Sequence, residues 1–229
     1  MVVAGHSYGA TGALRALRGG PTDARPFRGA IALDPAKQIG PPNDDVRVPL
    51  LVVHSDSWSR PGRSSRSSGG TGTGVLYGAE GRAHFDVVRD LVARANARGH
   101  PAWFVTSIGT SHPSVTDAAL LEPALLRFTT GATIDVYQGL RQYVHVAEDF
   151  LAFLARGQVR GLLAEKAEFP HYDPGAAAGA AARLGLGKPG WGGGRDKRFV
   201  EDLRQGEWAD WRRHWQIHVS PAGNVGEKR

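Results

Sequence analysis

The chain has 229 residues, 41% of them hydrophobic, and a formal net charge of +6 at pH 7, which suits one sizeable domain. Its Lys and Arg residues are scattered and form no sustained basic helix face with interleaved aromatic residues, so we expect no nucleic-acid partner. The absence of cysteine excludes disulfides, thiolate metal sites and a thiol nucleophile, and no apolar run is long enough to span a bilayer.

Predicted strands and helices alternate along the chain. In order, they are a strand over residues 1–5, a helix over 10–18, strands over 29–33 and 49–53, a helix over 81–98, a strand over 102–106 and a helix over 135–156 that stops at Gly157. The strands are continuous apolar runs, as expected for burial on both faces, and the two long helices carry apolar residues at helical spacing. We therefore predict an α/β fold with a mostly parallel sheet and helices on both faces.

Three segments depart from this alternation. Residues 59–74 are rich in Ser, Gly and Arg and too poor in apolar residues to offset the entropy of ordering, so we predict a disordered surface insertion within a domain over 1–170. Residues 171–197 are predicted to form a flexible Gly- and Ala-rich segment. The tail over 198–229 contains three tryptophans, and we expect it to dock back as a helix and a short strand.

The segment Gly5-His-Ser-Tyr-Gly9 matches a Gly-X-Ser-X-Gly nucleophile elbow. A predicted strand stands directly before it and a predicted helix directly after it, which is the context that this motif requires. There the glycines let the backbone turn sharply, and the turn exposes the serine hydroxyl at the edge of the sheet. An ordinary N-cap serine is the alternative. We predict Ser7 as a nucleophile and the N–H of Tyr8 as one donor of an oxyanion hole.

A serine hydroxyl needs a general base, and the base needs an acid that holds its tautomer. The chain order expected for this kind of site is serine, acid, histidine. His112 follows the fourth predicted strand, in the loop Gly109-Thr-Ser-His-Pro113, and is the predicted base. His54 comes too early for that order, while His84 and His145 fall in predicted helices.

Two aspartates compete for the role of the acid. Asp34 follows the second predicted strand and precedes Pro35, and Asp56 follows the third predicted strand. Because the carboxyl ends of parallel strands meet at one edge of the sheet, both are expected near Ser7. The order of the residues alone leaves both candidates open.

Three segments of the chain resemble loops of one known family, the platelet-activating factor acetylhydrolases, which are calcium-independent serine lipases of the α/β-hydrolase superfamily. The segment Gly5-His-Ser-Tyr-Gly-Ala-Thr11 is similar to the nucleophile elbow of that family, and Ala32-Leu-Asp-Pro35 is similar to its acid loop. The segment Thr110-Ser-His-Pro-Ser-Val-Thr-Asp117 is similar to its histidine loop. The resemblance covers roughly residues 1–165 in order and spacing.

The resemblance implies a serine hydrolase that cleaves a short sn-2 acyl ester of a phospholipid without a metal or a cofactor. It implies acylation of Ser7 with His112 as the base, and it favours Asp34 over Asp56 as the acid. In that family further strands precede the nucleophile strand, and a loop among them supplies the second oxyanion donor. We therefore expect this chain to be the C-terminal part of such a domain, without the N-terminal strands.

Two other functions stay open at this point. One is a different α/β-hydrolase carboxylesterase with Asp56 as the acid, and the other is a truncated, inactive hydrolase domain whose first strand has an unpaired edge. A lipid surface is a candidate partner, because residues 148–163, taken as a helix, have an apolar face and two arginines. The same periodicity favours the alternative that this stretch packs on the sheet.

Overall fold

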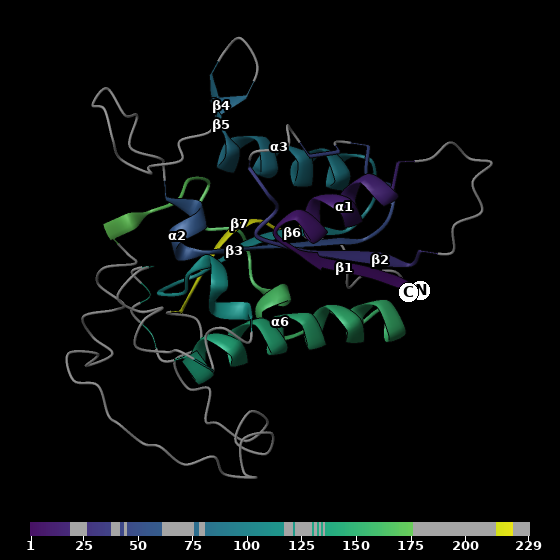
Figure 1. The fold of residues 1–229 in the computed structure, drawn as a ribbon. Coiled ribbons are helices and arrows are strands. Elements are labelled where there is room, and N and C mark those ends of the chain that lie inside the picture. The colour runs from purple at the N-terminus through teal and green to yellow at the C-terminus, as the bar shows by residue number, and fades with distance from the viewer. Residues whose placement is uncertain are drawn as a thin grey trace.

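The structure, a computed structural model, is centred on a five-stranded sheet (Figure 1). It describes residues 1–18, 27–37, 42–43, 45–60, 76–77, 81–116, 121, 130, 132, 134, 136–175 and 214–221. The strands lie in the order β1 (Val2–His6), β2 (Gly29–Leu33), β3 (Leu50–Ser55), β6 (Ala102–Ser107) and β7 (Trp215–Val219). The first four are parallel and β7 is antiparallel to β6, so the predicted mostly parallel α/β sheet is confirmed.

The central strands are buried on both faces, which explains their continuous apolar sequences. Every residue of β3 and β6 is buried. Successive side chains of a strand point to opposite faces, so Leu50 and Val52 pack into one hydrophobic cluster while Leu51 and Val53 pack into a second. The sheet therefore separates two cores, each of which needs a covering layer.

Helices provide that covering layer on both faces, as predicted. The helices α1 (Tyr8–Ala16) and α3 (His84–Ala97) cover one face, and α6 (Val136–Arg156) lies along the other (Figure 1). The second core contains Phe150 of α6, packed edge-on against the indole of Trp103. Short elements complete the described chain: α2 (Asp56–Ser59), β4 (Leu76–Tyr77), β5 (Arg82–Ala83), η1 (His112–Val115) and η2 (Gly161–Ala164).

The helix α6 ends at Arg156, and Gly157 follows with a φ of 70°, the left-handed conformation that glycine adopts readily. The stretch 148–163 is therefore not one helix, because its last residues form η2. Leu162 and Leu163 are buried in the second core, which supports packing on the sheet. Contact between this stretch and a lipid surface stays a prediction.

The predicted insertion over 59–74 begins too early. Ser59 belongs to α2, is 2% exposed, and its hydroxyl lies 2.6 Å from the Thr106 hydroxyl. Residues 61–74 lie outside the described residues, as do residues 176–197 of the predicted flexible segment and the expected helix of the tail. The expected short strand of the tail is β7, which extends the central sheet beyond β6.

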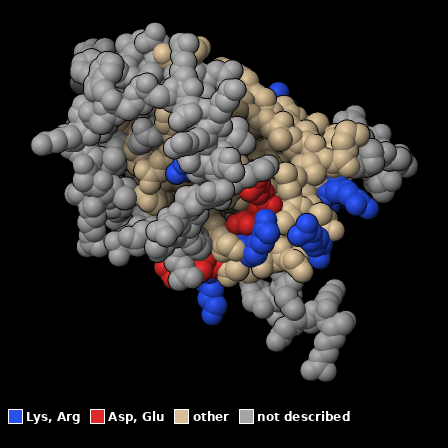
Figure 2. Space-filling view, turned by 90° about the horizontal axis from the view of Figure 1, so that it is seen from below, with Lys and Arg blue, Asp and Glu red and all other residues tan. Residues whose placement is uncertain are grey.

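The surface of the described residues carries charges of both signs. On the face seen in Figure 2, Lys and Arg side chains lie among Asp and Glu side chains. In one ion pair of the described residues, Arg160 lies 2.9 Å from Asp149. Among the helices that the structure describes, none is both long enough and apolar enough to cross a membrane.

Candidate active site

Ser7 lies at the sharp turn between β1 and α1, at the carboxyl end of the first strand. Its φ of 56° and ψ of −122° place it in a left-handed region that a residue with a side chain rarely adopts. Such a conformation costs about 1–3 kcal/mol and persists only where the surrounding structure holds it. The Ser7 N–H donates to the Leu33 carbonyl at 2.9 Å, which continues the pairing of β1 with β2 into the turn.

The two glycines of the motif differ: Gly5 fits the prediction that a glycine lets the chain turn sharply, and Gly9 does not need to be a glycine for lack of space. A Cβ on Gly5 would lie 2.3 Å from the carbonyl carbon of Gly9, so Gly5 is needed for the close approach of strand and helix. A Cβ on Gly9 would meet nothing within 4 Å among the described residues. The positive φ of the turn is at Ser7 itself, and a glycine would adopt that conformation more readily.

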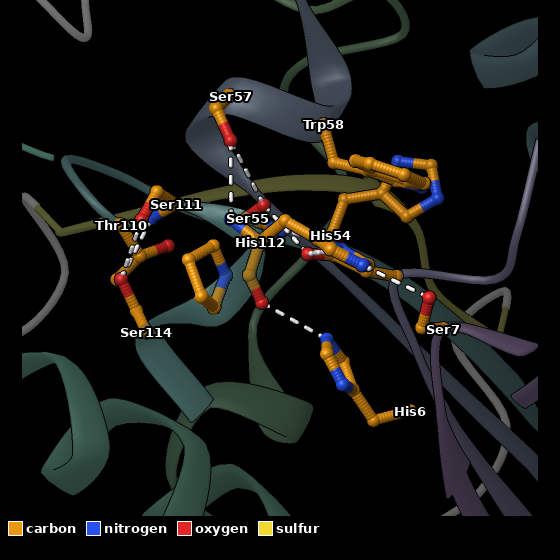
Figure 3. Close-up of polar contacts among 12 residues, drawn as sticks. His6, Ser7, His54, Ser55, Ser57, Trp58, Thr110, Ser111, His112 and Ser114 are labelled. Atoms are coloured by element: carbon orange, nitrogen blue, oxygen red, sulfur yellow. Dashed lines mark hydrogen bonds and ion pairs between the residues drawn. The ribbon is translucent and has the colours of Figure 1, made fainter. Parts of the chain in front are cut away.

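His112 is the residue that faces the Ser7 hydroxyl. Its Nε2 lies 3.0 Å from Ser7 Oγ, as the dashed line between them marks in Figure 3. His112 begins η1 after β6, and its N–H donates to the Ser57 hydroxyl at 3.2 Å. The loop is stiffened by Ser114, whose hydroxyl accepts the Ser111 N–H at 2.9 Å, and by Pro113. These contacts fix the backbone from which the imidazole projects.

Asp34 holds the other nitrogen of this imidazole. Its Oδ2 lies 3.1 Å from His112 Nδ1, and its side chain is 1% exposed. The backbone N–H and the hydroxyl of Ser55 donate to its two oxygens at 2.6 and 2.7 Å. Because a carboxylate only accepts hydrogen bonds, Nδ1 carries the proton and Nε2 can accept from Ser7. Asp34 also has a positive φ, 45°, at the end of β2.

Asp56 lies at the same sheet edge but has other partners. Its carboxylate forms an ion pair with Arg60 at 3.1 Å and accepts the N–H of Gly109 at 3.1 Å and the hydroxyl of Tyr172. Burial, with the bond to Asp56, raises the pKa of the Tyr172 hydroxyl. Within the described contacts, the structure brings Ser7, His112 and Asp34 together and leaves Asp56 outside that group.

The predicted oxyanion donor is next to the serine. Tyr8 is the first residue of α1, and the first N–H groups of a helix have no acceptor within the helix. The backbone N–H of Tyr8 is therefore available to a negatively charged oxygen beside Ser7, and the helix dipole favours negative charge there. Tyr8 itself is 60% exposed.

Three residues near His112 were not among the predicted site residues. The Nε2–H of His6 donates to the His112 carbonyl at 2.9 Å, and the two rings lie 4.5 Å apart. Burial, and then the neighbouring His112, lower the pKa of His6. The indole of Trp58 stacks on His112 at 4.0 Å, and Lys37 donates to the Trp58 carbonyl at 2.8 Å. The only sequence signal for them is their position, directly before Ser7 or just beyond the end of a strand.

The other histidines considered as bases have other partners in the described structure, and Ser7 Oγ contacts His112. His54 is buried and stacks on His84 with 5.5 Å between ring centroids. Burial lowers the pKa of His84 to about 3 and that of His54 well below its ordinary value, so both are neutral near pH 7. His145 lies on α6, 3.9 Å from Glu148.

One group in the described residues has the composition of a metal site. Ligand atoms of His6, Asp34 and His112 all lie within 4.8 Å of one another. However, a metal must lie in the plane of each imidazole that binds it, and these two rings face each other with only 36° between their planes. Both nitrogens of His112 also have partners already, in Asp34 and Ser7. The arrangement fits a hydroxyl, a base and an acid better than a metal.

Comparisons with known proteins add no assignment to this geometry. No protein-family model matches the chain, and no curated protein matches it with significance.

Proposed function

We propose that this chain carries the active site of a serine hydrolase that cleaves carboxylic esters with a short acyl group. The observation that carries the proposal is the continuous hydrogen-bonded series Ser7–His112–Asp34, in which each distance is near 3 Å. The three residues come from three different strand ends and follow the order serine, acid, histidine. On this proposal, the described sheet belongs to an α/β-hydrolase domain.

The acylation step follows from the positions of the three side chains. Ser7 Oγ attacks the carbonyl carbon of the ester while its proton passes to His112 Nε2. Asp34 stabilises the positive imidazolium through Nδ1–H, and the N–H of Tyr8 stabilises the oxyanion of the tetrahedral intermediate. The intermediate collapses, the bond to the alcohol breaks, and the leaving oxygen takes the proton from Nε2. The products of this step are the free alcohol and an ester on Ser7.

Deacylation repeats the same proton transfers with water. His112 Nε2 removes a proton from a water molecule, whose oxygen attacks the acyl carbon, and Ser7 Oγ then leaves with that proton. The net reaction consumes one water for each ester bond and uses no metal or cofactor.

We further propose that the substrate is the sn-2 acetyl or other short-chain ester of a phospholipid. This part rests on the resemblance of the three loops to those of the platelet-activating factor acetylhydrolases. A different carboxylesterase with Asp56 as the acid is less well supported, because the carboxylate of Asp56 binds Arg60 and Tyr172.

A chain-length series tests the proposal. The purified chain and its Ser7→Ala variant would be assayed with p-nitrophenyl acetate, butyrate and octanoate, and with a 1-alkyl-2-acetyl and a 1-alkyl-2-palmitoyl glycerophosphocholine. We expect the acetyl esters to be hydrolysed fastest and the rate to fall as the acyl chain lengthens. The Ser7→Ala variant should hydrolyse none of them. Hydrolysis of the p-nitrophenyl esters alone would refute the phospholipid assignment, and equal turnover by Ser7→Ala would refute the serine mechanism.

A further inference from the structure

Trp58 touches both the predicted base and the loop of the predicted acid. Its indole lies parallel to the imidazole of His112, with 4.0 Å between ring centroids and 12° between ring planes (Figure 3). The indole N–H donates to the carbonyl of Pro35 at 3.0 Å, and Pro35 directly follows Asp34. One side chain therefore connects the two loops that carry His112 and Asp34.

Trp58 is itself held from several sides. It belongs to α2, which follows β3 without a loop, and its carbonyl accepts the Lys37 ammonium at 2.8 Å. That ammonium also lies 4.4 Å from the centroid of the indole, although Lys37 is only 6% exposed. The preceding residue, Ser57, accepts the backbone N–H of His112. The position of the indole is thus set by the same corner of the fold that sets the backbone of His112.

The hydrogen bonds and the stack restrain different motions of the imidazole. The bonds to Ser7 and Asp34 determine which nitrogen faces which partner, but they allow the ring to tilt about the line between those nitrogens. An indole lying parallel at 4.0 Å blocks that tilt on one side. Proton transfer requires Nε2 to stay aligned with the serine oxygen, and small misplacements of reacting groups are costly in rate.

We propose that Trp58 is a positioning residue, which holds the ring plane of His112 so that Nε2 faces Ser7 and Nδ1 faces Asp34. The proposal rests on the proposed function, because positioning matters only if His112 transfers the serine proton. On this proposal, a residue of α2 positions the reacting groups in addition to Ser7, His112 and Asp34 themselves.

Two substitutions at this position separate stacking from bulk. Trp58→Phe keeps an aromatic face but loses the bond to Pro35, whereas Trp58→Leu keeps apolar volume and loses the face. Phe153→Ala is the matched control, because Phe153 packs on Trp103 at 5.1 Å on the α6 side of the sheet, in the second core. Thermal unfolding of each variant would show that it is folded before its kinetics are compared.

The kinetic readout is the reaction of Ser7 with a fluorophosphonate probe, resolved into binding of the probe and its covalent rate. We expect the covalent rate to fall about 10- to 100-fold in Trp58→Leu with little change in binding. Trp58→Phe is expected to recover most of that loss, and Phe153→Ala to react at the wild-type rate. A wild-type rate in folded Trp58→Leu, or equal losses in the Leu and Phe variants, would overturn the positioning role.

A spectroscopic readout does not depend on activity. The ring current of a stacked indole shifts the carbon-bound protons of His112 upfield in an NMR spectrum, and the signal is assigned by its absence in His112→Gln. We expect this upfield shift in wild type and its loss in Trp58→Leu. Folded wild-type protein that shows the shift but does not react with the probe would refute the proposed function and leave the stack standing. Absence of the shift in wild type would refute the stack.

Discussion

Exchanging the two competing aspartates for asparagine tests the assignment of the acid. In Asp34→Asn, an amide replaces a carboxylate that is 1% exposed and accepts the N–H and hydroxyl of Ser55 as well as His112 Nδ1–H. The amide NH2 can only donate, so in one arrangement it faces one of these three donors without forming a hydrogen bond to it. Alternatively, His112 changes its tautomer so that Nδ1 accepts from the amide, and Nε2 then carries the proton and no longer accepts from Ser7. In both cases the imidazole can no longer take the serine proton in its present orientation.

The expected loss in Asp34→Asn is on the order of 10³- to 10⁴-fold in the covalent rate. This corresponds to about 4–5.5 kcal/mol of activation free energy. In Asp56→Asn we expect a rate within about threefold of wild type, because Asp56 contacts none of the three reacting groups, but a loss of about 1–3 kcal/mol in stability as its bonds to Arg60 and Gly109 weaken.

The assay is the time course of labelling by a fluorophosphonate probe, followed by in-gel fluorescence, with thermal unfolding measured for both variants. The reverse pattern, with Asp56→Asn inactive and Asp34→Asn active, would assign Asp56 as the acid. If both folded variants reacted at the wild-type rate, the reasoning from the Asp34–His112 contact would be refuted.

The remaining predictions concern stability. Gly5→Ala should unfold at a much lower temperature than wild type, because its Cβ would lie 2.3 Å from backbone atoms of Gly9. Gly9→Ala should have a melting temperature equal to or above that of wild type. Equal melting temperatures of the two variants would contradict the close approach of Gly5 to Gly9. Burial lowers the pKa of His84 to about 3 and of His218 to about 4, below the 6.5 of the unfolded chain. Each neutral imidazole therefore contributes stability above pH 6.5 that is lost as the pH falls toward 4, by about 1.4 kcal/mol per pH unit. Because the two contributions add, urea unfolding at pH 7, 5.5 and 4.5 should show a slope that approaches about 2.8 kcal/mol per pH unit at the acid end. The His218→Gln variant should lose about half of that slope, and an equal slope in the variant would exclude His218 as a source.

The sheet was predictable from sequence because its strands are apolar without interruption. Residues such as Leu50–Val53 leave no polar face, and only a strand covered on both sides suits them. The same argument placed Ser7 and His112 at strand ends, where parallel strands bring loops together. The order of the residues left both Asp34 and Asp56 open and only the family resemblance favoured Asp34, whereas the structure places the Asp34 carboxylate 3.1 Å from His112 Nδ1.

The parts that were missed depend on contacts between distant segments. Trp58 lies in a four-residue helix, too short for a periodic signal, and its stack on His112 joins residues 54 positions apart. Ser59 is of a residue type common in the low-complexity segment that follows it, yet it is buried and its hydroxyl contacts the Thr106 hydroxyl of β6. Gly9 matches the motif, but only the geometry shows that Gly5 alone of the two is constrained by space.

Mass spectrometry tests whether Ser7 is an activated nucleophile. The folded chain would be treated with a fluorophosphonate, its intact mass measured, and the modified peptide sequenced. We predict one adduct per chain, on Ser7, and no adduct on Ser7→Ala under the same conditions. An unmodified folded chain, or an adduct on another residue that persists in Ser7→Ala, would contradict it.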